Sequence, residues 1–220
     1  MVYTLWGEPD SGSFMIEAAL AQAGQAVTLI DIDLTKDEQH HAQYLAINPL
    51  GKIPALRFED GTTIVQSAAI LLALSEAHPE AKLMPAFDAP DRRHALRWLI
   101  HVAAEIYPLI EVYDYPLRFA PPETSDTAMR SRVRHRIRER WLLVEQAASA
   151  EGSFLLSGFS AIDLAIAVIS SWAIGGEWRT KECPKLTRIT EAVSARPAVA
   201  PVWRRHFGDK QVTHHRLPAH

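Results

Sequence analysis

Hydrophobic and polar positions follow a clear order along the first 80 residues. A β-type run at residues 2–6 leads through a Pro- and Gly-containing turn into an Ala- and Leu-rich segment, 14–23, which is typical of a helix and stops at Gly24. Residues 27–32 predict a strand that is buried on both sides. The pattern therefore predicts a strand, a helix and a second strand, with the helix crossing over between two parallel strands.

The same unit continues with shorter elements. A short helix is expected around residues 37–46. Asp60-Gly61 separates two short β-type runs, and this pair is typical of a two-residue type I′ hairpin turn. Ser67 is expected to cap an apolar helix over residues 68–77, which Pro79 ends. The order β-α-β, short helix, β-β-α predicts a small mixed sheet.

Beyond residue 90 only helical periodicity remains. Apolar residues recur at helical spacing in three stretches: Leu96, Leu99, Ile100, Ala103 and Tyr107; Val133, Ile137, Trp141 and Val144; Leu186, Ile189 and Val193. Pro108 is expected to kink or end the first helix, and Arg196-Pro197 to close the last. Ser160 and Asp163 predict a capping box at a further helix start. The predicted fold class is an α/β unit followed by an all-α unit.

The sign of the net charge changes near residue 80, close to the end of the predicted α/β unit. Residues 1–80 hold 3 Lys and Arg against 11 Asp and Glu, a net charge of −8, whereas residues 81–220 have a net charge of +5. Pro79, Pro85 and Pro90 stiffen the chain near this boundary. We therefore expect a first domain at 1–80, a linker at 81–90, a helical domain at 91–208 and a polar tail at 209–220.

Composition narrows the class of protein. The net charge of −3 over 220 residues gives no overall basic field for nucleic acid or a membrane surface. A single cysteine, Cys183, excludes an intramolecular disulfide and a cysteine-cluster metal site. The first residues lack a signal peptide's basic and apolar regions, and the longest apolar stretch, 161–173, is too short to span a bilayer. We expect a cytoplasmic protein without a bound metal.

Three segments carry a resemblance to a known family. Residues 48–56 read Asn-Pro-Leu-Gly-Lys-Ile-Pro-Ala-Leu, with a turn at Pro49 and Gly51 and with Pro54 at the head of a strand. Residues 66–70 read Gln-Ser-Ala-Ala-Ile, and residues 159–164 read Phe-Ser-Ala-Ile-Asp-Leu. In this order and separation the segments resemble the glutathione S-transferase family. The resemblance implies a thioredoxin-like N-terminal domain followed by an all-helical C-terminal domain.

The resemblance also implies how glutathione, the co-substrate, is held. The Ile53–Pro54 bond is expected to be cis, so that the backbone of Ile53 pairs with the cysteinyl part like an added strand. Gln66 and Ser67 are expected to hold the γ-glutamyl end at a helix N-terminus, where free N–H groups favour a carboxylate. Lys52, or alternatively His40 in the His40-His41 pair, is expected near the glycine carboxylate.

Catalysis in the family depends on the glutathione thiolate. A hydroxyl at the start of the first helix, together with the helix dipole, can favour the anion. Two serines stand there, and we expect Ser11 to be the donor. Ser13 is an alternative, with a helix N-cap as its other role. Activation by backbone N–H groups alone remains the third possibility.

The second domain is expected to supply the pocket for a small, largely apolar electrophile. Its candidate residues are Tyr107, Tyr113 and Tyr115, with Phe119 and Trp172 as further aromatics. The resemblance implies the activity of a glutathione transferase working in detoxification, and it implies a homodimer. Glutathione-dependent disulfide reduction or lyase chemistry, and a catalytically silent interaction module, are the alternatives.

Alternate arginines give residues 130–140 the most basic stretch of the chain. They flank the apolar stripe Val133-Ile137-Trp141, which favours a solvated helix over a nucleic-acid or phosphate patch.

Overall fold

The computed structural model describes residues 2–121, 123–172, 174 and 176–208, so the tail expected at 209–220 lies outside the described residues. Its sheet has four strands in the order β2-β1-β3-β4. Strand β1 (Tyr3–Gly7) pairs in parallel with β2 (Val27–Asp31) and antiparallel with β3 (Ala55–Arg57), which pairs antiparallel with β4 (Thr63–Val65). The expected mixed sheet, with a parallel pair extended by an antiparallel hairpin, is confirmed.

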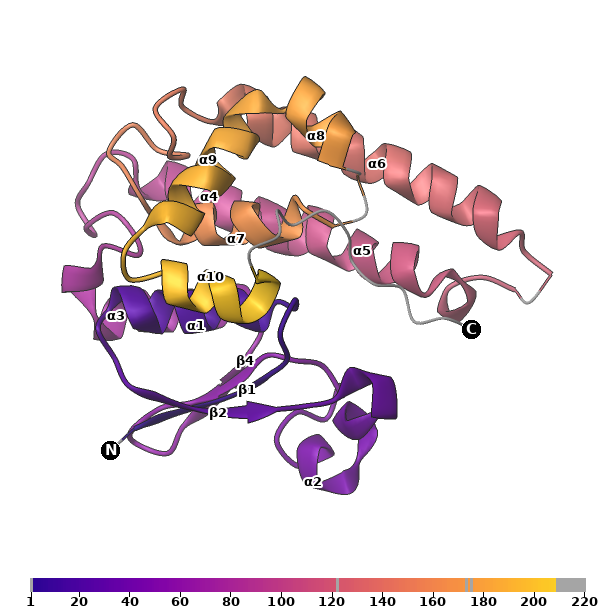
Figure 1. Cartoon of the computed structure of the whole chain (residues 1–220), viewed down its shortest axis with the longest axis horizontal. Helices are drawn as coiled ribbons and strands as arrows, with labels where there is room; N and C mark the ends of the chain where they lie inside the picture. Colours follow the sequence, from indigo (N-terminus) through magenta and orange to yellow (C-terminus); the bar gives the residue numbers. More distant parts are fainter. Residues whose placement is uncertain (1, 122, 173, 175, 209–220) are drawn as a thin grey trace.

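The sheet is covered on both faces. Helices α1 (Ser13–Gln22) and α3 (Ser67–Ala77) lie on one face, between the sheet and the remaining helices (Figure 1). Phe14 of α1 and Leu71 of α3 join Leu5 and Leu56 in the main core. On the opposite face, Tyr44 of the short helix α2 (Ala42–Leu45) packs in a second cluster that includes Trp6. We call this part of the molecule, residues 3–81, the sheet region.

Seven α-helices follow in the part of the chain described after residue 91, which we call the helical region. They are α4 (Arg92–His101), α5 (Tyr107–Asp114), α6 (Asp126–Ala147), α7 (Ala161–Ile169), α8 (Gly176–Glu182), α9 (Pro184–Ala195) and α10 (Ala200–Phe207). A π-helical segment, Val102–Ile106, joins α4 to α5, and short 3₁₀ turns occupy Leu34–Lys36, Glu38–His40, Pro79–Ala81 and Pro116–Arg118. Every residue of α7 is buried, and this helix contacts α1, α4 and α9. The observed fold is an α/β unit followed by helices, as predicted, while the exact domain boundaries stay a prediction.

Several local predictions are confirmed. The Ile53–Pro54 bond is cis. The capping box at α7 is formed, since the Asp163 carboxylate accepts from the Ser160 N–H at 2.7 Å and from the Phe154 N–H at 2.6 Å. Burial raises the pKa of Asp163 to about 6, although those donors oppose the shift. The predicted apolar stripes of α6 and α9 are buried.

The sheet region differs from prediction at three points. Strand β2 is an edge strand with a half-exposed pattern, because it pairs with β1 alone, so the expectation of burial on both sides was wrong. The helix expected at 37–46 is interrupted at His41, whose φ of −69° and ψ of 144° are extended, so the segment forms a 3₁₀ turn and the four-residue α2. In the hairpin only Gly61, with φ 89°, has a positive φ, and its N–H bonds to the Phe58 carbonyl; the two-residue type I′ turn was wrong.

Helix starts and one buried face also differ. Ser13 and Ser67 are each the first residue of their helix rather than its N-cap, and Gly12 and Gln66 occupy the cap positions. On α4, Leu96 and Ile100 are exposed, because Ala95, Trp98 and Leu99 form the buried face. The prediction also missed the short helices α8 and α10.

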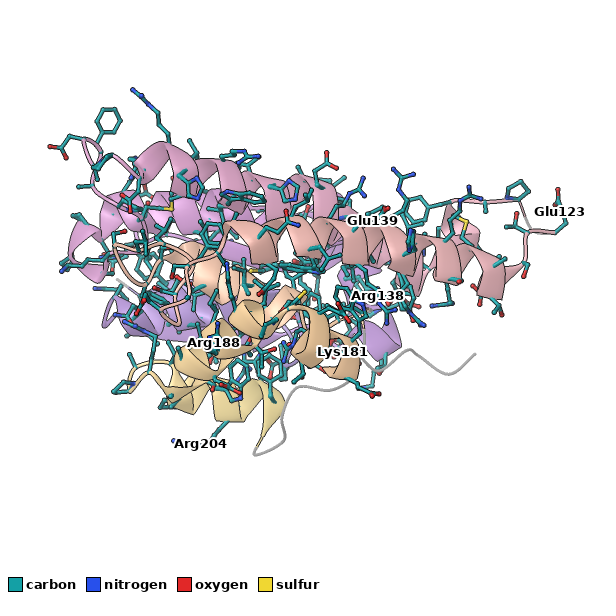
Figure 2. All side chains as sticks on the ribbon, turned by 90° about the horizontal axis from the view of Figure 1, so that it is seen from above. Glu123, Arg138, Glu139, Lys181, Arg188 and Arg204 are labelled. Carbon is teal, nitrogen blue, oxygen red and sulfur yellow. The ribbon has the colours of Figure 1, made fainter. Side chains whose placement is uncertain are left out.

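Some arginines of helix α6 make hydrogen bonds within the molecule, and others are exposed to solvent. Arg130 donates to the carbonyls of Tyr113 and Asp114, and Arg138 donates to the Ile174 carbonyl at 2.6 Å. Figure 2 shows Arg138 on the side of α6 that faces α8, with Glu139 on the opposite side. Arg132 and Arg136 are exposed to solvent. Among the described helices, none has the length and apolarity that crossing a membrane requires.

Candidate functional site

A cavity of about 470 Å³ lies where the sheet region meets the helical region. One wall contains the starts of α1 and α3 and the segment before β3, which includes Ser11, Ile53 and Ser67. The other wall comes from α4, the π-helical segment, α5 and α7. The cavity therefore brings together two helix N-termini, which favour negative charge, and a largely apolar surface.

The turn between β1 and α1 is fixed by the two serines. The hydroxyls of Ser11 and Ser13 both lie within hydrogen-bond distance of the Glu8 carbonyl, at 2.6 and 2.8 Å, and they are 2.9 Å from each other. Gly7 leaves room for this arrangement, since a Cβ there would lie 2.3 Å from the Cβ of Ser13. Ser11 lines the cavity, whereas Ser13 is buried and is not among the lining residues. The structure thus brings Ser11, and not Ser13, to the cavity.

The segment before β3 is held from behind. The carbonyl of Lys52 accepts from the Tyr44 hydroxyl at 2.8 Å and from the Asn48 side-chain amide at 2.5 Å. Burial raises the pKa of Tyr44 to about 12, so its hydroxyl stays a donor. No described residue bonds to the backbone N–H or C=O of Ile53, which leaves both groups open to the cavity.

Sequence reasoning missed the supporting role of Tyr44 and Asn48. For Asn48 a signal exists, because Asn directly before Pro is typical of a turn, and its side chain accepts from the Leu50 N–H. Tyr44 carries no comparable signal, since only the packing of α2 against the sheet brings its hydroxyl to the Lys52 carbonyl.

The start of α3 presents a hydroxyl and free backbone groups. Gln66, the N-cap, is exposed and has φ 73° and ψ 109°, a backbone conformation that residues other than glycine seldom adopt. Ser67 follows, half-buried in the cavity wall, and its hydroxyl makes no hydrogen bond to the described residues. The first N–H groups of a helix lack intrahelical partners, so this corner is suited to a carboxylate.

At the edge of the cavity a salt bridge joins the two walls. The Lys52 ammonium lies 2.6 Å from a carboxylate oxygen of Glu111 on α5. His40 packs over Gly51, whose missing Cβ would lie 2.6 Å from the His40 Nδ1. Both residues expected near the glycine carboxylate therefore line the cavity, and Lys52 already has an acidic partner.

The helical wall contains most of the expected aromatic residues. Tyr107, Tyr115 and Trp172 line the cavity. Tyr113, which was expected in the pocket, does not line this cavity, and its hydroxyl accepts a hydrogen bond from Arg134. Phe119 is 51% exposed and also lies outside the cavity. Cys183 is buried away from this site, and burial raises the pKa of its thiol to about 12.

Comparisons with known proteins cover most of the chain. Residues 1–75 match the family described as "Glutathione S-transferase, N-terminal domain". A glutathione S-transferase of Escherichia coli is 24% identical over 200 residues, which are 89% of this chain and 94% of that protein. A maleylacetoacetate isomerase of Pseudomonas aeruginosa is 34% identical over 103 residues, which are 46% of this chain and 48% of that protein.

A solved structure agrees in fold. The crystal structure of a glutathione transferase homolog from Sulfitobacter, with bound glutathione, superposes with a TM-score of 0.80 at 25% identity, covering 91% of this chain and 96% of that one. The agreement thus includes the sheet region, the helical region and the place where they meet. Residues 1–75 therefore match the N-terminal domain of the glutathione S-transferase family, and the chain as a whole is similar in fold to a glutathione transferase homolog.

Proposed function

We propose that this protein binds glutathione in the cavity and directs its thiolate onto the electrophilic carbon of a small, largely apolar second substrate. The observation that carries the proposal is one cavity of about 470 Å³ that pairs a wall with two helix N-termini and the Ile53 segment with a largely apolar wall. Glutathione is a tripeptide with two carboxylates, and the sheet region offers an unpaired backbone segment between two helix N-termini. The apolar wall then accounts for the second substrate.

Glutathione would lie along the sheet-region wall. The backbone N–H and C=O of Ile53 would pair with the cysteinyl residue as an added strand does. The γ-glutamyl carboxylate would accept from the Ser67 hydroxyl and the first N–H groups of α3, and the exposed Gln66 amide could reach the ammonium group. Lys52 or His40 would meet the glycine carboxylate at the other end.

This orientation puts the sulfur at the start of α1, near Ser11. A thiol with a pKa of about 8.5 is only a few per cent ionised at pH 7, and each unit by which that pKa falls corresponds to about 1.36 kcal/mol. The partial positive charge at the start of α1 lowers the cost of the anion, and a hydroxyl donor lowers it further. The thiolate then attacks the electrophilic carbon, the leaving group departs with its electron pair, and a thioether forms.

The apolar wall would hold the second substrate. Leu99, Val102 and Ile169 line it together with the rings of Tyr107 and Trp172, and Met15 of α1 adds apolar surface from the opposite side. Such a surface favours an apolar molecule, because burying apolar area contributes roughly 25 cal/mol per Å². Tyr115, with Arg118 stacked 3.9 Å from the centre of its ring, lies at the far end of the same wall.

Isomerisation through the same thiolate is a second candidate. It is supported by the similarity of almost half the chain to a maleylacetoacetate isomerase. The thiolate would add to a conjugated double bond and leave again after rotation, so that glutathione is regenerated. Disulfide reduction and lyase chemistry would use the same sulfur position.

One experiment separates these outcomes. Calorimetric titration with glutathione is followed by assays that measure glutathione consumption and product with an apolar electrophile, a disulfide and an unsaturated carbonyl compound. Conjugation consumes one glutathione per product, disulfide reduction yields oxidised glutathione, and isomerisation consumes none. Binding without turnover of any probe would favour an interaction module, and absence of binding would contradict the proposal.

We also propose that the protein is a two-fold homodimer, with the sheet region of one subunit against the helical region of the other. The net charges of −8 and +5 on the two parts favour such contacts. Leu96 and Ile100, one turn apart on α4, expose 41% and 44% of their surface and offer an apolar patch. Light scattering should give twice the mass of the 24.6 kDa chain, and Leu96→Glu should shift it to the monomer. A wild-type monomer at all micromolar concentrations would contradict the dimer.

A further inference from the structure

Tyr107 and Gly12 approach each other unusually closely across the cavity. A Cβ built on Gly12 would lie 2.2 Å from the Tyr107 hydroxyl and 3.2 Å from the ring carbon that bears it. Gly12 is the N-cap of α1, and Tyr107 is the first residue of α5. The tyrosine of the helical region therefore places its hydroxyl directly over the helix start of the sheet region.

The backbone gives no reason for a glycine at position 12. Its φ of −60° and ψ of −13° are helical values that any residue adopts, so these angles do not require a glycine. The space taken by the Tyr107 hydroxyl is what excludes a side chain. Gly12 and Tyr107 thus form a matched pair whose result is a hydroxyl at the start of α1.

The hydroxyl of Tyr107 is free to donate, unlike that of Ser11. No described residue makes a hydrogen bond to the Tyr107 hydroxyl, whereas the Ser11 hydroxyl donates to the Glu8 carbonyl at 2.6 Å and accepts from the Ser13 N–H. Burial raises the pKa of Tyr107, so the phenol keeps its proton near neutral pH. To reach a ligand, Ser11 must first give up an existing hydrogen bond, and Tyr107 need not.

The position of the ring is also well defined. Tyr107 follows the π-helical segment Val102–Ile106, and Pro108 comes next, so the wider helical turn ends at this residue. Its ring packs against Trp172, with 5.8 Å between ring centres, and both residues line the cavity. Local π-helical turns often occur at functional sites.

We propose that Tyr107 is a catalytic residue whose hydroxyl donates a hydrogen bond to the glutathione sulfur, ahead of Ser11. This inference rests on the proposed function and adds to it a donor from the helical region. The thiolate would then sit between the two regions, held by the start of α1 on one side and by the phenol on the other. No bond to Tyr107 forms or breaks in this role.

The test measures the pKa of the bound thiol from the ultraviolet absorbance of its thiolate. Tyr107→Phe removes only the hydroxyl and should raise this pKa by about one unit or more, because a hydrogen bond to a charged group is lost. Ser11→Ala should raise it less. Tyr113→Phe is the matched control on the same helix, because the Tyr113 hydroxyl lies outside the cavity and accepts a hydrogen bond from Arg134. This variant should leave the thiol pKa unchanged.

A second pair of variants tests the geometry without removing the hydroxyl. Gly12→Ala should raise the thiol pKa in the wild-type background, because the new methyl group displaces the phenol. In the Tyr107→Phe background the same substitution should have little further effect, which makes the two changes non-additive. Additive effects would overturn the inference.

Binding of S-methylglutathione, which has no thiol, distinguishes a hydrogen bond to the sulfur from a role of Tyr107 in the shape of the cavity. It also tests the proposed function separately from the inference. Tyr107→Phe should bind it as the wild type does. If that affinity falls as well, or if the thiol pKa stays unmoved while glutathione still binds, Tyr107 is not the sulfur donor and the proposed function stands. If the wild type binds neither ligand, the proposed function fails and the inference falls with it.

Discussion

The two walls of the cavity are held in place by different kinds of contact. In the sheet region the lining groups are fixed by neighbours in the sequence: Ser11 by Glu8, and Lys52 by Asn48. In the helical region the lining residue Asp114 is held by a residue farther along the chain, since Arg130 of α6 donates to its carbonyl at 3.0 Å. The difference suggests that the first wall sets the ligand that the family shares, and that the second can change with the packing of helices.

In the sheet region, we expect the largest loss of glutathione affinity when the Ser67 hydroxyl is removed. Ser67→Ala should weaken glutathione binding by about 10-fold or more, since a hydrogen bond to a charged group contributes ~1.5–3 kcal/mol. Stability should change little, because Ser67 is not the N-cap of α3. Calorimetry gives the affinity.

Ser75→Ala is the control for this variant. Ser75 lies on the same helix, and its hydroxyl donates to the Leu72 carbonyl at 2.7 Å, away from the cavity. Equal glutathione affinities for the Ser67 and Ser75 variants would remove Ser67 from the binding site.

In the helical region, we expect the loss of the Arg130 side chain to destabilise the cavity wall without weakening glutathione binding. Arg130→Ala removes the donor to two carbonyls at the end of α5, and we expect the free energy of unfolding to fall by about 1–2 kcal/mol. The KM for the second substrate should rise, while the Kd for glutathione should stay the same. Chemical denaturation and steady-state kinetics measure these changes.

Arg132→Ala provides the matched comparison, because Arg132 is on the same helix but exposed. Its effect on stability should stay within roughly 0.5 kcal/mol. A large loss of glutathione affinity in Arg130→Ala would show that the two walls are not independent.

The same contrast explains what the sequence could predict. The segments at 48–56 and 66–70 are short patterns, and they allowed the turn before β3 and a helix that begins near residue 67 to be predicted. The candidate role of Ile53 followed from the family resemblance that these segments carry. The capping box of Ser160 and Asp163 was predictable for the same reason, since its partners lie three residues apart.

Contacts between distant elements were beyond sequence reasoning. Tyr107, Tyr113 and Tyr115 are all candidates that the family resemblance implies, and only the packing of α5 against α6 shows that Tyr113 faces Arg134 and not the cavity. The pairing of Lys52 with Glu111 spans 59 positions in the chain and has no local signal. Likewise, helical spacing alone did not show that Leu96 and Ile100 lie on the exposed side of α4.

The smallest expected effect concerns the salt bridge that joins the walls. Glu111→Gln should strengthen glutathione binding by a few-fold at most, because it frees Lys52 for the glycine carboxylate and because exposed ion pairs contribute only ~0–1 kcal/mol. Lys52→Met should weaken binding by a similar factor. Calorimetry at two salt concentrations checks both changes, and weaker binding in Glu111→Gln would place the carboxylate elsewhere, with His40 as the next candidate.

The most direct measurement is a crystal structure of the protein with glutathione. We predict the peptide along the sheet-region wall, with its cysteinyl backbone paired to Ile53 and its γ-glutamyl carboxylate at Ser67. The sulfur should lie at the start of α1, within hydrogen-bonding distance of the Tyr107 hydroxyl. Glutathione bound outside the cavity, or with its sulfur pointing away from Gly12 and Tyr107, would contradict this account.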